Sequence, residues 1–377
     1  MRTLRIFTIH LFLLFAAACV TTGCDDPVST TRTVENPKEI SAEQREPLAP
    51  AQSDAGSGTA TDSDVTEPVV DQQPVPVQLN APSGQSGSQT TEVTPEANTE
   101  VNPKVDHNDP TSYPVTKLAE KQDGQILMLS WNVESEGAEA DTVCEELSKL
   151  NTELNAEDRY DVVALTEVLP QDLKKFRLAL GKHYKYAYSK SGWNDRLQIL
   201  YNENKFKKVR HFELDEINVN GRYRAPLVVH LKQLETDVEF LVMVNHLARG
   251  KSEIRQEQAK LLVEWGRDQN LPVFGLGDYN FDYEFSSEKG NPAFVNFMQD
   301  NIWRWLKPTE LVDTNWYDNP KDPDGKDDFP GSMLDFAFVA GPAKDWTSSC
   351  QIIVRENDFP DDEKTSDHRP YEVVAQK

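Results

Sequence analysis

Seven polar side chains of three chemical kinds stand beside apolar runs of the length that a buried strand needs. Each lies within a few residues of the end or the beginning of such a run; they are Asn132, Glu167, His246, Asp278, Asn280, Asp367 and His368. Carboxylate and amide oxygens form the set that a hard divalent cation prefers, and imidazoles gain or lose a proton near neutral pH. Any one of these residues is ordinary, but their gathering at five strand boundaries predicts a metal-dependent acid–base site.

The elements that must hold these residues follow from the hydrophobic pattern. Buried strands are expected over 125–131, 161–166, 197–201, 227–231, 240–245, 273–276, 334–339 and 371–374. Amphipathic helices are expected over 138–154 and 252–267, where apolar residues recur at helical spacing. Many strands with interspersed helices predict a layered α/β or α+β fold built around two sheets.

Composition divides the chain of 377 residues into a tail and a domain. Between Asp25 and Ser112 there is no Phe, Trp or Tyr, whereas 11 of the 23 prolines lie there. Such a segment cannot bury enough apolar surface to offset its ordering entropy, so we expect a disordered linker over 25–115 and one folded domain over 116–377. The net charge of −24 excludes the broad basic surface of a non-specific nucleic-acid binder, but not a polyanion bound one phosphate at a time.

The first 24 residues resemble the signal peptide of a bacterial lipoprotein. Two arginines precede an apolar run over 6–20, which is too short for a comfortable membrane span. Small residues then precede Cys24, which we expect to be lipidated; Cys19 is a second candidate, and an ordinary cleaved signal is the alternative. We therefore expect an exported protein, held at the membrane of the cell envelope by its lipid or secreted. Cys144 and Cys350 would remain, as separate thiols rather than a disulfide.

The ordered motifs WN, TE, NHL, GDYN, LDF and SDHRP resemble those of the exonuclease/endonuclease/phosphatase superfamily, which has the fold of deoxyribonuclease I. Each motif is common by itself, but their order and strand context together are specific. The resemblance runs from about Gln125 to Val374. It implies a four-layered α/β sandwich of two packed mixed β-sheets flanked by helices, with the active site at one end of the sheets.

The resemblance also implies a metal site and a phosphate site. Glu167 would be the principal metal ligand, with Asn132 and Asp367 beside it. The ion would be Mg²⁺ or Mn²⁺, with Ca²⁺ as a further candidate. Asp278 and Asn280 would orient or deprotonate the attacking water and hold the phosphate.

Two histidines would flank the scissile phosphorus. By the same resemblance, Asp195 pairs with His246, and Asp335 pairs with His368. A carboxylate in that place fixes the imidazole tautomer and raises its pKa. Asp278 and His368 are both candidates for the base that acts on water, and His246 is the favoured acid.

The implied function is a metal-dependent phosphoester hydrolase, with an extracytoplasmic nuclease as the first choice. Arg224 aligns with a phosphate-contacting arginine of the nuclease branch, or is a surface arginine. The substrate is then DNA, or alternatively a small or lipid phosphoester, and a lipoprotein binding module without catalysis is a further alternative. We expect a monomer.

Two further features stay open at this point. The acidic segment 318–330 is either a solvated turn or a Ca²⁺ site. Trp303 and Trp305 either pack in the core or stack on a base or lipid head group.

Overall fold

The computed structural model describes residues 106–153, 158–362 and 364–377. The expected signal peptide, its Cys24 and nearly all of the expected linker lie outside the described residues. Within them, no helix is both long and apolar enough to cross a membrane.

Two six-stranded sheets form the centre of the described fold. In the first sheet the strand order is β11-β12-β1-β2-β4-β3, and in the second it is β5-β6-β7-β8-β10-β9. The strands of the first sheet are β1 (Ile126–Asn132), β2 (Val162–Val168), β3 (Tyr184–Tyr188), β4 (Arg196–Asn202), β11 (Thr347–Ile352) and β12 (Tyr371–Gln376). Those of the second are β5 (Phe206–Glu213), β6 (Leu227–Gln233), β7 (Glu239–His246), β8 (Val273–Glu284), β9 (Arg304–Trp305) and β10 (Ser332–Ala340). Both sheets are mixed, because β1 pairs with β2 and β7 pairs with β8 in parallel, while the other pairs are antiparallel.

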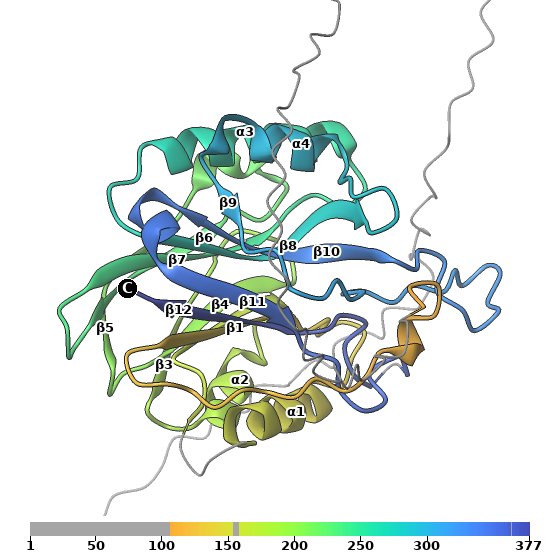
Figure 1. The fold of residues 1–377 in the computed structure, drawn as a ribbon, viewed down its shortest axis with the longest axis horizontal. Helices are drawn as coiled ribbons and strands as arrows, with labels where there is room; N and C mark the ends of the chain where they lie inside the picture. Colours follow the sequence, from red (N-terminus) through yellow and green to blue (C-terminus); the bar gives the residue numbers. More distant parts are fainter. Residues whose placement is uncertain (1–105, 154–157, 363) are drawn as a thin grey trace, which may run out of the picture. The chain divides into compact units, whose positions relative to one another are not determined.

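Four helices cover the outer faces of the two sheets. Helices α1 (Ala140–Thr152) and α2 (Leu173–Leu180) lie over the first sheet, and α3 (Ser252–Arg267) and α4 (Pro292–Met298) lie over the second (Figure 1). The result is the four-layered sandwich that the sequence predicts.

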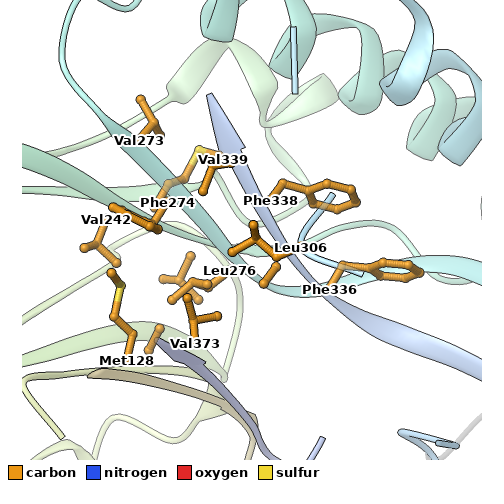
Figure 2. Packing of buried hydrophobic residues seen from close by; sticks show 14 of the residues in the cluster. Met128, Val242, Val273, Phe274, Leu276, Leu306, Phe336, Phe338, Val339 and Val373 are labelled. Atoms are coloured by element: carbon orange, nitrogen blue, oxygen red, sulfur yellow. The ribbon is translucent and has the colours of Figure 1, made fainter. Parts of the chain in front are cut away.

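The core owes its two layers to the alternation of side chains along each strand. In β1, Met128 faces the second sheet, whereas Leu127 and Leu129 belong to the cluster beneath α1 and α2. Between the sheets, Met128 and Val373 lie opposite Val242 and Leu276 (Figure 2). Strands covered on both faces read as continuous apolar runs, which is why the sequence pattern marks them so clearly.

Several elements differ from the sequence-based expectation. Strand β8 extends to Glu284, far beyond the expected 273–276, while α3 matches its expected range. Strands β3, β5, β9 and β11 and helices α2 and α4 were not predicted. The exposed pattern of β5 explains its omission, since most of its side chains are not buried.

Residues before the predicted domain boundary at 116 contact the domain. Tyr113 is buried, and its hydroxyl donates to Oδ2 of Asp313 at 2.8 Å. Arg369 donates to the carbonyl oxygen of Pro110 at 2.9 Å and forms a buried pair with Asp358. The segment from about residue 110 is therefore part of the packed structure.

The two cysteines of the domain are free thiols. Cys350 is buried in β11, and Cys144 is partly buried in α1. The expectation of two separate thiols is confirmed.

Candidate active site

Four predicted site residues meet where parallel strands of the two sheets end or turn. Nδ2 of Asn132 lies 3.1 Å from Oε1 of Glu167 and 3.4 Å from Oδ2 of Asp278. Nε2 of His246 lies 3.5 Å from the same two oxygens. Because Asn132 and Glu167 come from the first sheet and His246 and Asp278 from the second, the site spans both sheets.

A bulge in β2 aims the Glu167 side chain into this cluster. The register between β2 and β4 shifts between Leu165 and Val168, and Glu167 takes a left-handed backbone with φ of 58°. Bulges that redirect a side chain are common beside active sites. The Glu167 carboxylate is 26% exposed, so it is open to a ligand.

A glycine brings Asp278 into place inside β8. Gly277 has φ of 124°, and a Cβ there would lie 2.1 Å from the carbonyl oxygen of Asn245 on β7. Only glycine permits both that conformation and that close approach. The next turn is fixed by Asn280, whose backbone N–H donates to Oδ1 of Asp278 at 2.9 Å and whose amide donates to Leu247 at 3.1 Å.

His368 is held by a buried carboxylate, as the resemblance implies. Its Nδ1 lies 2.7 Å from Oδ2 of Asp335, which leaves Nε2 directed elsewhere, 3.7 Å from Oδ1 of Asp367. Burial lowers the pKa of His368, but the charges of Asp335 and Asp367 outweigh burial and raise the pKa to about 10. The Ser366 hydroxyl ties this loop to β1, because it donates to the Asn132 carbonyl and accepts from the His368 N–H.

His246 has a different environment. Burial and the positive charges of Arg224, His368 and Arg249 hold the pKa of His246 well below its usual range. Among the described residues its Nδ1 has no hydrogen-bond partner. The Asp195 carboxylate, expected to pair with His246, is instead bound by Arg224.

Asp195 nevertheless belongs to the same cluster. Ligating atoms of Asp195, Glu167 and His246 all lie within 4.8 Å of one another. The pairing of Asp195 with His246 during the reaction therefore stays a prediction, as does a contact of Arg224 with phosphate.

The donor set fits a hard divalent cation. Burial and the carboxylate of Asp335 raise the pKa of Asp278 to about 7, and burial also raises the pKa of Asp367 above its usual range. Oδ1 of Asp367 is buried without a hydrogen-bond partner. Crowded carboxylates, one of which has an oxygen that accepts no hydrogen bond, are what a cation would stabilise. The assignment of Glu167, Asn132 and Asp367 as its ligands stays a prediction.

Two residues near the site were missed at the sequence level. Oε2 of Glu134 accepts the N–H of Asp367 at 2.9 Å, and burial, followed by the charge of Asp367, raises the pKa of Glu134 to about 8. Arg249 stacks over the ring of Tyr317, 5.6 Å from its centroid, and its charge acts on His246 and Asp367. Glu134 stands two residues after the WN motif, and Arg249 stands two residues after the NHL motif. This closeness to a motif is the signal that could have identified them.

The structure places the side chains of both open features, and the Ca²⁺ alternative for segment 318–330 stays a prediction. In the segment 318–330, Asp318 and Asp327 accept hydrogen bonds from nearby backbone N–H groups. Trp303 is 1% exposed and stacks on Trp265 and Phe297, so it packs in the core. Trp305, in β9, packs on Tyr283 and other rings of the core.

Comparison with known proteins agrees with this geometry. The sequence pattern that defines the endonuclease/exonuclease/phosphatase family matches residues 129–368. The chain belongs to this family. Its members are hydrolases that act on phosphoesters and depend on divalent metals. No curated protein matches the chain.

Solved structures of this family share the fold. A mannosyl-6-phosphatase of Bacteroides thetaiotaomicron, Bt3783, is 19% identical with a TM-score of 0.50, over 66% of this chain and 98% of that one. A humanized D. rerio TDP2 is 16% identical with a TM-score of 0.52, over 68% of this chain and all of that one. At these identities the likeness establishes the sandwich fold, and the substrate must be argued from the site.

Proposed function

We propose that this chain is a divalent-metal-dependent phosphodiesterase that cleaves nucleic acid outside the cytoplasm. One observation carries the proposal: the cluster of Asn132, Glu167, His246 and Asp278 spans both sheets, and the loop that carries His368 is tied to the end of β1, where Asn132 lies. Phosphodiester cleavage needs a base for water, a proton for the leaving oxygen and compensation of the phosphate charge.

In this proposal Asp278 accepts the proton of the attacking water. Asn280, fixed by its bonds to Asp278 and Leu247, orients the phosphate. His368 donates a proton from Nε2 to the leaving oxygen, because Asp335 holds the Nδ1 proton and keeps the ring in one orientation. In the part of the chain that the structure describes, no carboxylate accepts from Nδ1 of His246, so we assign His246 a hydrogen bond to the phosphate in place of the acid role that the sequence favours. A divalent ion held by Glu167, Asn132 and Asp367 would neutralise charge on the phosphate oxygens.

The substrate class is the finer part of the proposal. Arg224 and Arg249 place positive charge beside the cluster, which suits a phosphate group. The net charge of −24 favours weak, distributive contact with DNA over tight binding, and it keeps a small phosphoester as the second candidate.

The place of action is also proposed, on the N-terminal sequence. Cys24 after a short apolar run supports a lipid anchor at the cell envelope. Replacement of Cys24 by Ser should move the protein from the membrane fraction to the soluble fraction; an unchanged distribution would contradict the anchor.

The full chain should be tested on plasmid DNA, RNA, sphingomyelin and bis-p-nitrophenyl phosphate, with Mg²⁺ or Mn²⁺ and then with chelator. We expect metal-dependent nicking of plasmid, reduced at least about 10²-fold in His368→Ala and His246→Ala. Hydrolysis of the small diester with DNA untouched would favour the second candidate. A His368→Ala protein with full activity would contradict the assigned chemistry.

A further inference from the structure

An exposed tryptophan stands next to the catalytic cluster, and the mechanism above does not use it. Trp193 is 80% exposed, on the loop between β3 and β4. All seven tryptophans lie in the described residues, and among them only Trp193 has an exposed side chain. Exposure of so large an apolar surface to water is unfavourable, and a ligand that covered the ring would recover part of that free energy.

Trp193 lines a hollow that shares Asp195 with the cluster. The hollow measures about 250 Å³ and is lined by Gly192, Trp193, Asp195 and the segment 222–224. Asp195 joins it to the cluster, because its carboxylate lies within 4.8 Å of ligating atoms of Glu167 and His246. The hollow is therefore a direct neighbour of the cluster, with Asp195 common to both.

The loop that carries Trp193 is fixed in place rather than loose. One nitrogen of the Arg196 guanidinium donates to the carbonyl oxygens of Lys190, Ser191 and Gly192, at 2.7, 3.0 and 2.9 Å. The Glu213 carboxylate accepts the N–H groups of Lys190 and Ser191 at 2.7 and 2.9 Å. These bonds order the backbone immediately before the exposed ring, so this backbone has little remaining entropy to lose when a ligand binds.

The same loop is joined to the opposite wall of the hollow. The hydroxyl of Ser191 accepts the N–H of Ala225 at 2.9 Å, and Asp195 is bound by Arg224. A Cβ on Gly192 would lie 3.1 Å from Cγ of Arg224, and φ of 87° at this glycine favours no other residue. These contacts hold together the two walls of the hollow. Trp193 lies on one wall, and Arg222 and Tyr223 lie on the other.

We infer that this hollow binds the nucleobase of the nucleotide whose phosphate occupies the catalytic cluster. The hollow has space for one ring and is lined by two aromatic side chains, Trp193 and Tyr223, and by the exposed guanidinium of Arg222. Such groups stack on bases without regard to sequence. This inference rests on the proposed function and extends it. It assigns recognition of the nucleobase to the side chains of Trp193, Tyr223 and Arg222.

The test uses three diesters with one leaving group. Thymidine 5′-(p-nitrophenyl phosphate), methyl p-nitrophenyl phosphate and cyclohexyl p-nitrophenyl phosphate differ only in the group that would enter the hollow. We expect the wild-type full chain to prefer the thymidine diester to both others by about tenfold or more in kcat/KM. Trp193→Ala should reduce that ratio to near one, and Trp193→Phe should restore most of it. Val295→Ala, an exposed apolar residue of α4, is the matched control and should keep the wild-type ratio.

A calorimetric titration with thymidine 5′-monophosphate separates this inference from the proposed function. We expect about tenfold weaker binding by Trp193→Ala. If the wild type hydrolyses none of the diesters but binds the nucleotide through Trp193, the proposed function fails and the base site stands. Two outcomes would overturn the base site. In one, Trp193→Ala leaves the preference for the thymidine diester over the other diesters unchanged. In the other, the wild type hydrolyses the cyclohexyl diester as well as the thymidine diester.

Discussion

Oδ2 of Asp335 lies 2.7 Å from Nδ1 of His368, and both residues are 2% exposed. Asp335 belongs to β10 of the second sheet, whereas His368 precedes β12 of the first. The hydrogen bond therefore crosses between the sheets and fixes the imidazole tautomer in a place that water cannot reach.

Asp335→Asn should lower kcat on DNA, whose leaving alkoxide needs a proton, by about 10²-fold or more, with a much smaller change in KM. The amide is uncharged, so it neither stabilises the imidazolium nor imposes the same tautomer. Asp300→Asn, which removes an exposed partner of Arg267, should retain wild-type kinetics. Equal kcat values for Asp335→Asn and wild type would remove His368 from the proton transfer.

Glu167→Gln should weaken the response to metal. With one charge fewer among the ligands, we expect the Mg²⁺ or Mn²⁺ concentration for half-maximal activity to rise at least about tenfold. A readout without turnover is the thermal midpoint, which metal should raise in the wild type and leave nearly unchanged in the variant. Glu253→Gln, an exposed acid in the first turn of α3, should respond like the wild type. A wild-type metal response in Glu167→Gln would place the ion elsewhere.

Gly277→Ala should destabilise the fold by about 3 kcal/mol or more, because the left-handed backbone and the close approach to Asn245 both oppose a side chain. Urea unfolding followed by circular dichroism measures this. Gly250→Ala is the matched control, since a Cβ there meets nothing within 4 Å. If the two variants unfold at the same urea concentration, the strand contact does not constrain Asp278.

The two thiols of the domain should react slowly while it is folded. Burial, aided by Asp141, raises the pKa of the Cys144 thiol to about 12, and burial raises that of Cys350 above its usual range. Since the thiolate is the nucleophile, iodoacetamide at pH 8 should label neither residue in buffer and both in denaturant. Peptide mass spectrometry reports each site. Rapid labelling of native Cys350 would contradict its burial, and labelling that needs a reductant would indicate a disulfide.

The sequence was most informative where both faces of a strand are buried. Uninterrupted apolar runs located β1, β2 and β7, and therefore the positions of Asn132, Glu167 and His246. It was least informative where side chains are half exposed, as in β5.

The sequence also could not place contacts that depend on backbone irregularities or distant partners. Asp278 lies inside a long β8 that passes through Gly277 with positive φ, and it does not follow the end of a short strand. The pairing of Asp195 with Arg224 depends on how two loops meet, which no local pattern encodes.

The position of β12 determines when the site can exist. This strand lies between β11 and β1, and Met128 pairs with Val373 across about 245 residues of chain. Asp367 and His368 immediately precede it, so a ribosome must pass residue 368 before the cluster has all of its members. Contacts of such long sequence separation form slowly, and the site is among the last parts to assemble. The cluster is thus incomplete for as long as the ribosome is translating the residues before His368.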